Sequence, residues 1–375
     1  MAPVNQDFHS TELHGRLSSL AEAIPRHARP IILTHDFPDP DALASAGALH
    51  LLLARHFHYH SLIAYSGMVT RAENREMLRH FRYHIRPLEE IRRRRRALAL
   101  LVDAQPHTGK ITLPDWVVPV AVFDHHPPSP RLPPGLWRDI RPHIGACSSV
   151  LYEYLAAAGV PVPAWLASCM VYAIETETMD FTRGGTAFDR TAYLDLLPRA
   201  SLRILGRIKH APLPLSYFSL LQQATASARW LGRVAWTHLP QAPNPEIAAE
   251  VADRLVRLEN ITHAFCTALG PDTLWISVRS NRRNAGCAAW VRAAVRSRGS
   301  AGGHDRLAAG SIPITGLSAE ERNALLDEVH SALLRHIARR AGIRTSDAEH
   351  HAQRLLPTYE ARADSSIGSP AAPPS

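Results

Sequence analysis

Residues 34–41 read Thr-His-Asp-Phe-Pro-Asp-Pro-Asp, directly after the apolar run 30–33 and before a helix-like segment, 41–55. A buried strand that ends in a histidine and two carboxylates brings three hard metal ligands to one edge of a sheet. In an open α/β sheet the carboxyl edge of the parallel strands is where ligands bind. The stretch therefore predicts an α/β fold, with His35, Asp39 and Asp41 at a site on this edge.

The two aspartates of this stretch are separated by a single proline. Side chains two residues apart in an extended segment leave the chain on the same side, so Asp39 and Asp41 can face one cavity. Two adjacent carboxylates repel each other unless a cation lies between them. Taken alone, the stretch fits equally well a second interpretation, in which Asp39 makes the turn and Asp41 caps the helix.

Two further apolar runs end in the same residue types. The run 97–102 has the continuous apolar pattern of a strand buried on both faces, and it ends at Asp103. The run 117–123 is followed by Asp-His-His at 124–126. Three successive strands that end in metal-ligand types favour a metal site over helix capping.

A fourth acidic cluster follows an apolar helix predicted over 165–174. Its carboxylates are Glu175, Glu177 and Asp180. Helices are also predicted over 11–24, 71–80 and from about 145 to 158, and a short strand over 61–65.

The length of 375 residues predicts about two domains. We expect a catalytic domain at 11–197, a helical connector at 198–228 and a second α/β domain at 229–342. Within the second domain the pattern predicts strands at 229–238, 261–269 and 273–279 and helices at 246–258, 285–297 and 318–340. The end of the chain, 343–375, has too little apolar content to fold and is predicted to be mostly disordered.

The basic residues number 42 against 34 acidic ones, and only Lys110 and Lys209 are lysines. Arginine suits phosphate through its planar fork, although a GC-rich genome gives the same bias. The arginine run at 92–96 is interpreted as a solvated helix end rather than a nucleic-acid patch.

The four cysteines lie far apart and form no CxxC pair, so neither a zinc site nor a disulfide framework is predicted. No apolar run approaches the length of a membrane span, and residues 1–7 lack the pattern of a signal peptide. We expect a soluble, cytoplasmic protein without a membrane partner.

Taken in order, His35-x3-Asp39-x-Asp41, Asp103, the triplet Asp124-His125-His126 and a distal Gly302-Gly303-His304 resemble the DHH phosphoesterases with their C-terminal associated domain. Within that family the chain is similar to the two-domain group of nanoRNases, 3′-phosphoadenosine-5′-phosphate phosphatases and cyclic-dinucleotide phosphodiesterases. The resemblance implies an N-terminal parallel-sheet DHH domain, a smaller C-terminal α/β domain and an active site in the cleft between them. The resemblance is compatible with a homodimer.

The resemblance also implies roles for individual residues. A first Mn²⁺ would be held by His35, Asp39 and Asp103, and a second by Asp41, Asp103, His125 and Glu177, so that Asp103 bridges two ions ~3.5–4 Å apart that activate a water. His126 would lie behind the ions or donate to the phosphoryl oxygens, and Asp124 would orient a histidine ring. Arg279, Gly302, Gly303 and His304 would bind the substrate, a short RNA or a small nucleotide.

The sequence departs from the family pattern at two positions. The usual glycine between the paired aspartates is Pro40, and the usual Asp-Thr is here Glu177-Thr178. An alternative function therefore stays open, in which a DHH scaffold with weakened metal binding serves as a nucleotide- or RNA-binding module. A family II pyrophosphatase is disfavoured because the Gly-Gly-His element is typical of the nucleotide-acting branch.

Overall fold

The protein divides into two compact units, Met1–Leu213 and Pro214–Ser375, in a computed structural model. The structure describes residues 6–91, 96–303, 305–342 and 353–354. The boundary between the units falls within the segment 198–228 that the sequence predicts as a connector. Most of the arginine run at 92–96, His304 and nearly all of the tail at 343–375 lie outside the described residues, as do the predictions made for them.

The first unit is built on a six-stranded sheet in the order β3-β2-β1-β4-β5-β6, and all of its strand pairs are parallel. The predicted α/β fold with an N-terminal parallel sheet is confirmed. The strands are β1 (Ile31–Leu33), β2 (Leu62–Tyr65), β3 (Ile85–Pro87), β4 (Ala97–Val102), β5 (Val117–Asp124) and β6 (Trp137–Ile140).

The order of these strands creates a crevice at one place. The chain adds β2 and β3 on one side of β1, then returns to add β4, β5 and β6 on the other side. Loops that leave the carboxyl ends of β1 and β4 therefore run in opposite directions and leave a gap between them. The residues that follow β1 and β4, near His35 and Asp103, lie at this gap.

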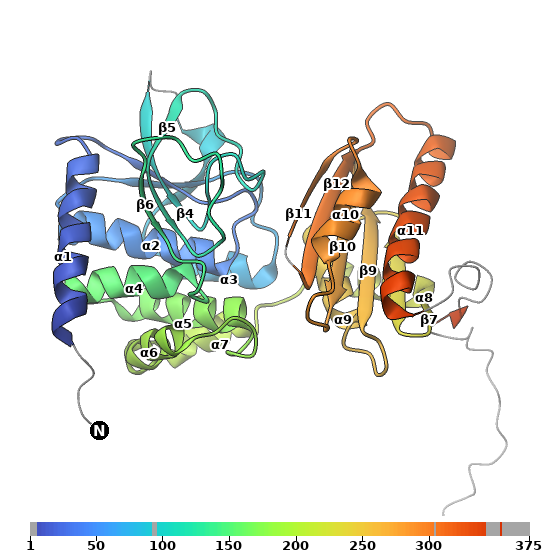
Figure 1. Cartoon of the computed structure of the whole chain (residues 1–375). Coiled ribbons are helices and arrows are strands. Elements are labelled where there is room, and N and C mark those ends of the chain that lie inside the picture. The colour runs from blue at the N-terminus through green and yellow to red at the C-terminus, as the bar shows by residue number, and fades with distance from the viewer. Residues whose placement is uncertain (1–5, 92–95, 304, 343–352, 355–375) are drawn as a thin grey trace, which may run out of the picture. The chain divides into compact units, whose positions relative to one another are not determined.

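The helices of the first unit pack on one face of the sheet, as Figure 1 shows for α1, α2 and α4. The opposite face is covered by the segment after β4, through Ala104, Ile111 and Trp116. The helices are α1 (Gln6–Ala23), α2 (Pro40–Arg55), α3 (Ala72–His80), α4 (Cys147–Ala157), α5 (Ala164–Thr178), α6 (Ala187–Leu196) and α7 (Leu202–Lys209), with short 3₁₀ turns at Leu88–Glu90 and Leu197–Arg199.

The second unit has a seven-stranded sheet in the order β11-β12-β10-β9-β8-β7-β13, antiparallel except for the pair β8 and β9. Its strands are β7 (Arg229–Leu231), β8 (Val234–Leu239), β9 (His263–Leu269), β10 (Thr273–Ser280), β11 (Ser300–Gly303), β12 (Leu307–Pro313) and β13 (Gln353–Arg354).

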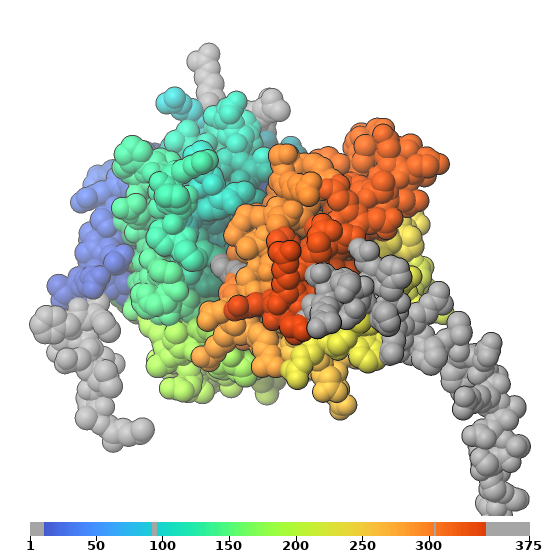
Figure 2. All heavy atoms as spheres, turned by 45° about the vertical axis from the view of Figure 1, so that its right-hand side comes forward, coloured from blue at the N-terminus to red at the C-terminus, as the bar shows by residue number. Residues whose placement is uncertain are grey.

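Helices cover both faces of this second sheet. One core joins the sheet to α10 (Cys287–Val295) and α11 (Ala319–Ala341), and the other joins it to α8 (Leu215–Ser227) and α9 (Glu246–Leu255). The orange-to-red part of the chain, which includes α11, forms an outer surface in the space-filling view (Figure 2).

One sequence prediction for the second unit needs correction. The single strand predicted over 229–238 is a hairpin, because Gly232 takes a left-handed φ of 54° and turns β7 back onto β8. The Gly-Gly element is part of the edge strand β11. At Gly303, with φ of 137°, a Cβ would lie 2.4 Å from the Leu307 carbonyl oxygen, so only glycine fits there.

The described part of the chain contains no helix that is both long and apolar enough to cross a membrane. All four cysteines are buried free thiols.

A buried carboxylate that the sequence does not single out joins two helix starts. Asp189 accepts hydrogen bonds from the backbone N–H groups of Gly145 (2.9 Å) and Ala146 (3.1 Å), which precede α4. It also accepts from the N–H (2.9 Å) and hydroxyl (2.6 Å) of Thr186, the N-cap of α6. Asp189 therefore fixes the entry of α4.

We predict that Asp189→Ala lowers the free energy of unfolding by about 3 kcal/mol, because several buried donors lose their acceptor. Asp195→Ala, at an exposed position of the same helix, is the matched control and should be nearly neutral. Urea denaturation of both variants checks this. Equal stability of the two variants would show that Asp189 does not hold these helix starts.

Candidate metal centre

Asp103 lies at the end of β4, in the gap at the centre of the sheet. Its side chain is 1% exposed, and its φ of 54° places a non-glycine residue in the left-handed region. Oδ2 lies 3.5 Å from Nε2 of His35, and Oδ1 lies 3.3 Å from Nε2 of His125. The two oxygens of this carboxylate thus face two different histidines.

The side of Oδ2 is completed by Asp39, whose own Oδ2 lies 3.7 Å from Nε2 of His35. The other ring nitrogen of His35, Nδ1, donates to the Asp36 carbonyl oxygen at 2.8 Å, which orients Nε2 toward the two carboxylates. Oδ1 of Asp39 accepts from the Ala42 N–H at 2.9 Å. Asp39 therefore caps α2 and faces the site, so the two interpretations of this residue are compatible.

The side of Oδ1 brings three further groups together. Nε2 of His125 lies 3.9 Å from Oδ2 of Asp41 and 3.9 Å from Oε1 of Glu177. The ring of His125 is oriented by its Nδ1, which donates to the Ile144 carbonyl oxygen at 3.3 Å. Among the described residues, Oδ1 of Asp103 and Nε2 of His125 are buried without a hydrogen-bond partner. The two atoms face each other, and a cation between them would satisfy both.

Asp41 does not cap the helix in which it lies, contrary to the second interpretation of the sequence. Its Oδ2 accepts from the Cys147 N–H at 2.7 Å and its Oδ1 from the Ser148 N–H at 2.8 Å. These are the first amides of α4, whose partial positive charge favours a carboxylate. Asp39 already caps α2, and the side chain of Asp41 points to the start of α4 instead.

Glu177 is the acidic residue of its cluster that reaches the histidines. Glu175 accepts a hydrogen bond from the Tyr193 hydroxyl at 2.7 Å and pairs with Lys209. Asp180 is exposed, in a turn where three successive residues, 179–181, have positive φ. Because Glu177 lies in the last turn of α5, the negative end of that helix adds to the attraction for a cation.

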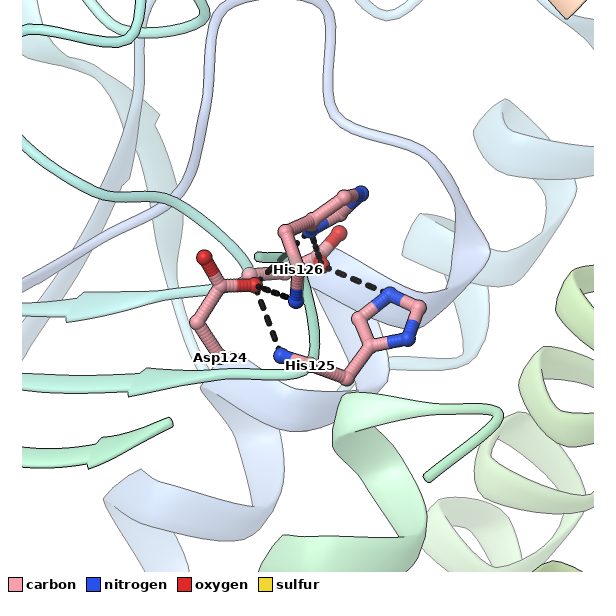
Figure 3. A group of neighbouring side chains, drawn as sticks. Asp124, His125 and His126 are labelled. Carbon is pink, nitrogen blue, oxygen red and sulfur yellow. Dashed lines mark hydrogen bonds and ion pairs between the residues drawn. The ribbon is translucent and has the colours of Figure 1, made fainter. Parts of the chain in front are cut away.

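Asp124 supports the centre by contacts to both histidines that follow it, as Figure 3 shows. Its Oδ1 accepts from the N–H groups of His125 (2.8 Å) and His126 (3.1 Å) and from Nδ1 of the His126 ring (2.8 Å). Its Oδ2 accepts from the Gln105 amide at 2.6 Å. Both oxygens accept hydrogen bonds, and through them Asp124 orients the ring of His126.

Two residues of this supporting layer are missed by the sequence analysis. Gln105 also binds the backbone at 126–129, and Lys110 donates to Nε2 of His126 at 2.6 Å. Both lie in the loop after Asp103, and their only signal is this proximity and the rarity of lysine in the chain.

The centre concentrates charge in a buried place. Burial, reinforced by the charge of Asp103, raises the pKa of Asp41 to about 8. Burial alone would lower the pKa of His125, but the Asp103 carboxylate outweighs it and raises that pKa to about 10. Burial would raise the pKa of Asp103, yet the surrounding histidines hold it well below its usual range. Such a cluster of carboxylates attracts compensating positive charge.

The residue types and distances fit a divalent metal. One group of potential ligand atoms, within 4.8 Å of one another, comes from His35, Asp39 and Asp103, and a second comes from residue 103 and the triplet 124–126. Mixed carboxylate and imidazole donors suit divalent transition ions. Both groups contain Asp103. The second group differs from the predicted ligand set, because it includes Asp124 and His126 in place of Asp41 and Glu177.

The predicted substrate residues lie in the second unit. Arg279, on β10, is 8% exposed; its Nε pairs with Asp253 and its Nη1 donates to the Ser277 hydroxyl at 2.8 Å. At Gly302 a Cβ would meet open space, while Gly303 packs against β12. A substrate role of these residues, of His304 and of a cleft between the units stays a prediction.

Comparison with solved structures supports the fold. An exopolyphosphatase-related protein from Bacteroides fragilis matches with a TM-score of 0.61 and 13% identity, over 86% of this chain and 98% of its own. The chain shares the fold of that protein. The likeness supports the predicted two-domain α/β fold, while membership of the DHH family and of its subgroup stays a prediction.

Other matches are weaker or partial. A putative family II inorganic pyrophosphatase from Methanococcus jannaschii has a TM-score of 0.43 and 15% identity over 80% of this chain and 98% of its own. The DHH domain of a member of the s1p family of ribosomal proteins has a TM-score of 0.42 and 14% identity over 86% of this chain and 91% of its own.

At the level of sequence, an uncharacterized protein from Methanocaldococcus jannaschii is 29% identical over 326 residues, which is 84% of this chain. The match spans 65% of that protein, so the chain covers less than two thirds of its relative's length. No family model matches the chain.

We predict that Glu177→Ala weakens Mn²⁺ binding at one of two subsites by at least about tenfold, because a carboxylate beside His125 is lost. Glu177→Asp should bind Mn²⁺ similarly or more tightly. Glu175→Ala, two residues away on the same helix and engaged with Tyr193, is the control for local damage to α5. Calorimetric Mn²⁺ titration measures all three. Unchanged stoichiometry and affinity in Glu177→Ala would remove this residue from the ligand set.

Proposed function

We propose that the protein is a Mn²⁺-dependent phosphoesterase that hydrolyses short oligoribonucleotides, 3′-phosphoadenosine-5′-phosphate or cyclic dinucleotides. The observation that carries the proposal is the carboxylate of Asp103, whose two oxygens face His35 and His125 separately. This arrangement is suited to two cations that share one ligand, which is the requirement of two-metal phosphoryl chemistry.

The residues would divide into two holding groups. His35 and Asp39 would hold one cation with Asp103, and His125, Asp41 and Glu177 would hold the other. When bound, such cations supply a water of lowered pKa and neutralise the charge that develops on the phosphoryl oxygens. Asp124 and Lys110 hold the His126 ring between them, and Gln105 fixes the backbone that follows it, so that this layer supports the centre from behind.

The nucleotide preference is supported by the chain's arginine content and by the resemblance of its distal Gly-Gly-His element. A phosphoanhydride substrate is the second candidate, because the structure that shares this fold is described as exopolyphosphatase-related. The binding-module alternative rests on Glu177, because the side chain of glutamate is one methylene longer than that of the usual aspartate.

A substrate panel separates these candidates. Purified protein is incubated with a short oligoribonucleotide, 3′-phosphoadenosine-5′-phosphate, a cyclic dinucleotide, pyrophosphate and tripolyphosphate, each with Mn²⁺ or with a chelator. We expect Mn²⁺-dependent release of mononucleotide or phosphate from a nucleotide substrate. Turnover of the polyphosphates alone would favour the phosphoanhydride candidate, and nucleotide binding without any turnover would favour the binding module.

We predict that Asp103→Ala lowers Mn²⁺-dependent turnover by a factor of at least about 10³, because both cations lose their shared ligand. Asp115→Ala, an exposed aspartate in the loop before β5, should keep full activity. Thermal unfolding is measured in parallel to show that the variant folds. Near-normal turnover of folded Asp103→Ala would contradict the two-metal assignment.

We predict that Arg279→Ala raises KM by about tenfold or more without changing Mn²⁺ affinity, since a charge-assisted contact to phosphate is worth roughly 1.5–3 kcal/mol. The effect of His304→Ala is expected to be similar. Asp253→Asn serves as the control: it breaks the ion pair of Arg279 and keeps the guanidinium. If both variants lose stability equally and keep their KM, Arg279 has only a structural role.

A further inference from the structure

The second unit contains a pocket of ≈ 290 Å³ at one end of its sheet. The pocket lies where β8 and β9 begin, where β10 has just ended and where α11 ends. The predicted substrate residues that the structure describes, Arg279, Gly302 and Gly303, do not line it. Its lining consists of Arg233, Thr262, His263, Arg282, Ala285, Arg340 and Ala341.

The floor of the pocket holds a buried histidine. His263 is 3% exposed, and its Nδ1 lies 2.7 Å from the Thr262 hydroxyl oxygen. Its other ring nitrogen, Nε2, is buried and has no hydrogen-bond partner among the described residues. Buried polar atoms are nearly always paired, so an unpaired one on a pocket wall indicates a place for a ligand atom.

The rim of the pocket is cationic. The residues Arg233, Arg282 and Arg340 are exposed, and in the described parts of the chain no carboxylate pairs with them; Arg340 donates to the Asn284 carbonyl oxygen at 2.6 Å. The neighbouring carboxylate of Asp305 is used elsewhere, since it accepts from the Gly286 N–H at 2.9 Å at the start of α10. Three arginines therefore line the pocket, and no carboxylate of the described residues pairs with them.

The ring of His263 carries no charge at neutral pH. Burial, together with the charges of Arg282 and Arg340, lowers the pKa of His263 to about 4, so its ring is neutral at pH 7. The Thr262 hydroxyl lies 3.4 Å from the Arg233 carbonyl oxygen and 2.7 Å from Nδ1. When it donates along the shorter contact to Nδ1, Nε2 carries the proton and is a donor. The pocket then offers one neutral donor below three charged ones.

We propose that this pocket binds a phosphate group, either as inorganic phosphate or as the phosphate monoester of a small ligand. Guanidinium forks match the oxygens of a tetrahedral anion, and a ring N–H supplies a further donor at the base. The volume suits a small anion or a compact ligand rather than a folded partner. The proposal does not depend on hydrolysis at the metal centre.

Calorimetric titration of the chelator-treated full-length chain with inorganic phosphate tests the proposal, because the metal centre then holds no cation that could bind the anion. We expect one saturable site. Arg282→Ala and Arg233→Ala should each raise Kd at least tenfold. Arg292→Ala removes an exposed arginine of α10 outside the pocket, and it should leave Kd unchanged.

A second measurement reports on the floor of the pocket. In ¹⁵N NMR spectra of the histidine rings, phosphate should shift Nε2 of His263, and Arg282→Ala should abolish that shift at the same phosphate concentration. Absence of saturable binding up to roughly 10 mM phosphate would overturn the proposal. So would equal binding by Arg282→Ala and Arg292→Ala, because phosphate would then bind outside this pocket.

Discussion

The structure of the candidate centre depends on one buried carboxylate, whose two oxygens face different histidines. Asp103 lies at the end of β4 in a left-handed conformation, where its oxygens face His35 on one side and His125 on the other. A buried aspartate in a strained backbone is costly unless its surroundings stabilise it. The histidines do so in part, and a pair of cations would complete this stabilisation.

The other buried carboxylates of the first unit are satisfied by the chain itself. Asp41 accepts from the first amides of α4, Asp124 from the amides after β5, and Asp189 from the loop before α4. These hydrogen bonds fix the conformation of the backbone around the centre. By contrast, Oδ1 of Asp103 has no hydrogen-bond partner among the described residues. This oxygen is therefore available to a ligand.

Sequence patterns predict the centre well because strand ends are local features. The apolar runs before His35, Asp103 and Asp124 specify parallel strands, and parallel strands bring their carboxyl ends to one edge. Interactions between distant segments are not encoded in such patterns. The contacts of Asp41 with α4 and of Lys110 with His126 depend on tertiary packing. The register shift between β4 and β5 depends on it too: residues 99 and 100 pair with residues 119 and 121, so one residue of β5 is left without a partner.

The central claim is that Asp103 is shared by two cations, and electron paramagnetic resonance of the Mn²⁺-loaded protein tests it most directly. Two Mn²⁺ ions joined by one carboxylate are magnetically coupled. The account predicts two Mn²⁺ per chain and a multiline spectrum of an exchange-coupled pair, which Asp103→Asn converts to the signal of isolated ions. A six-line spectrum of isolated Mn²⁺ in the unmodified protein at full loading would contradict it.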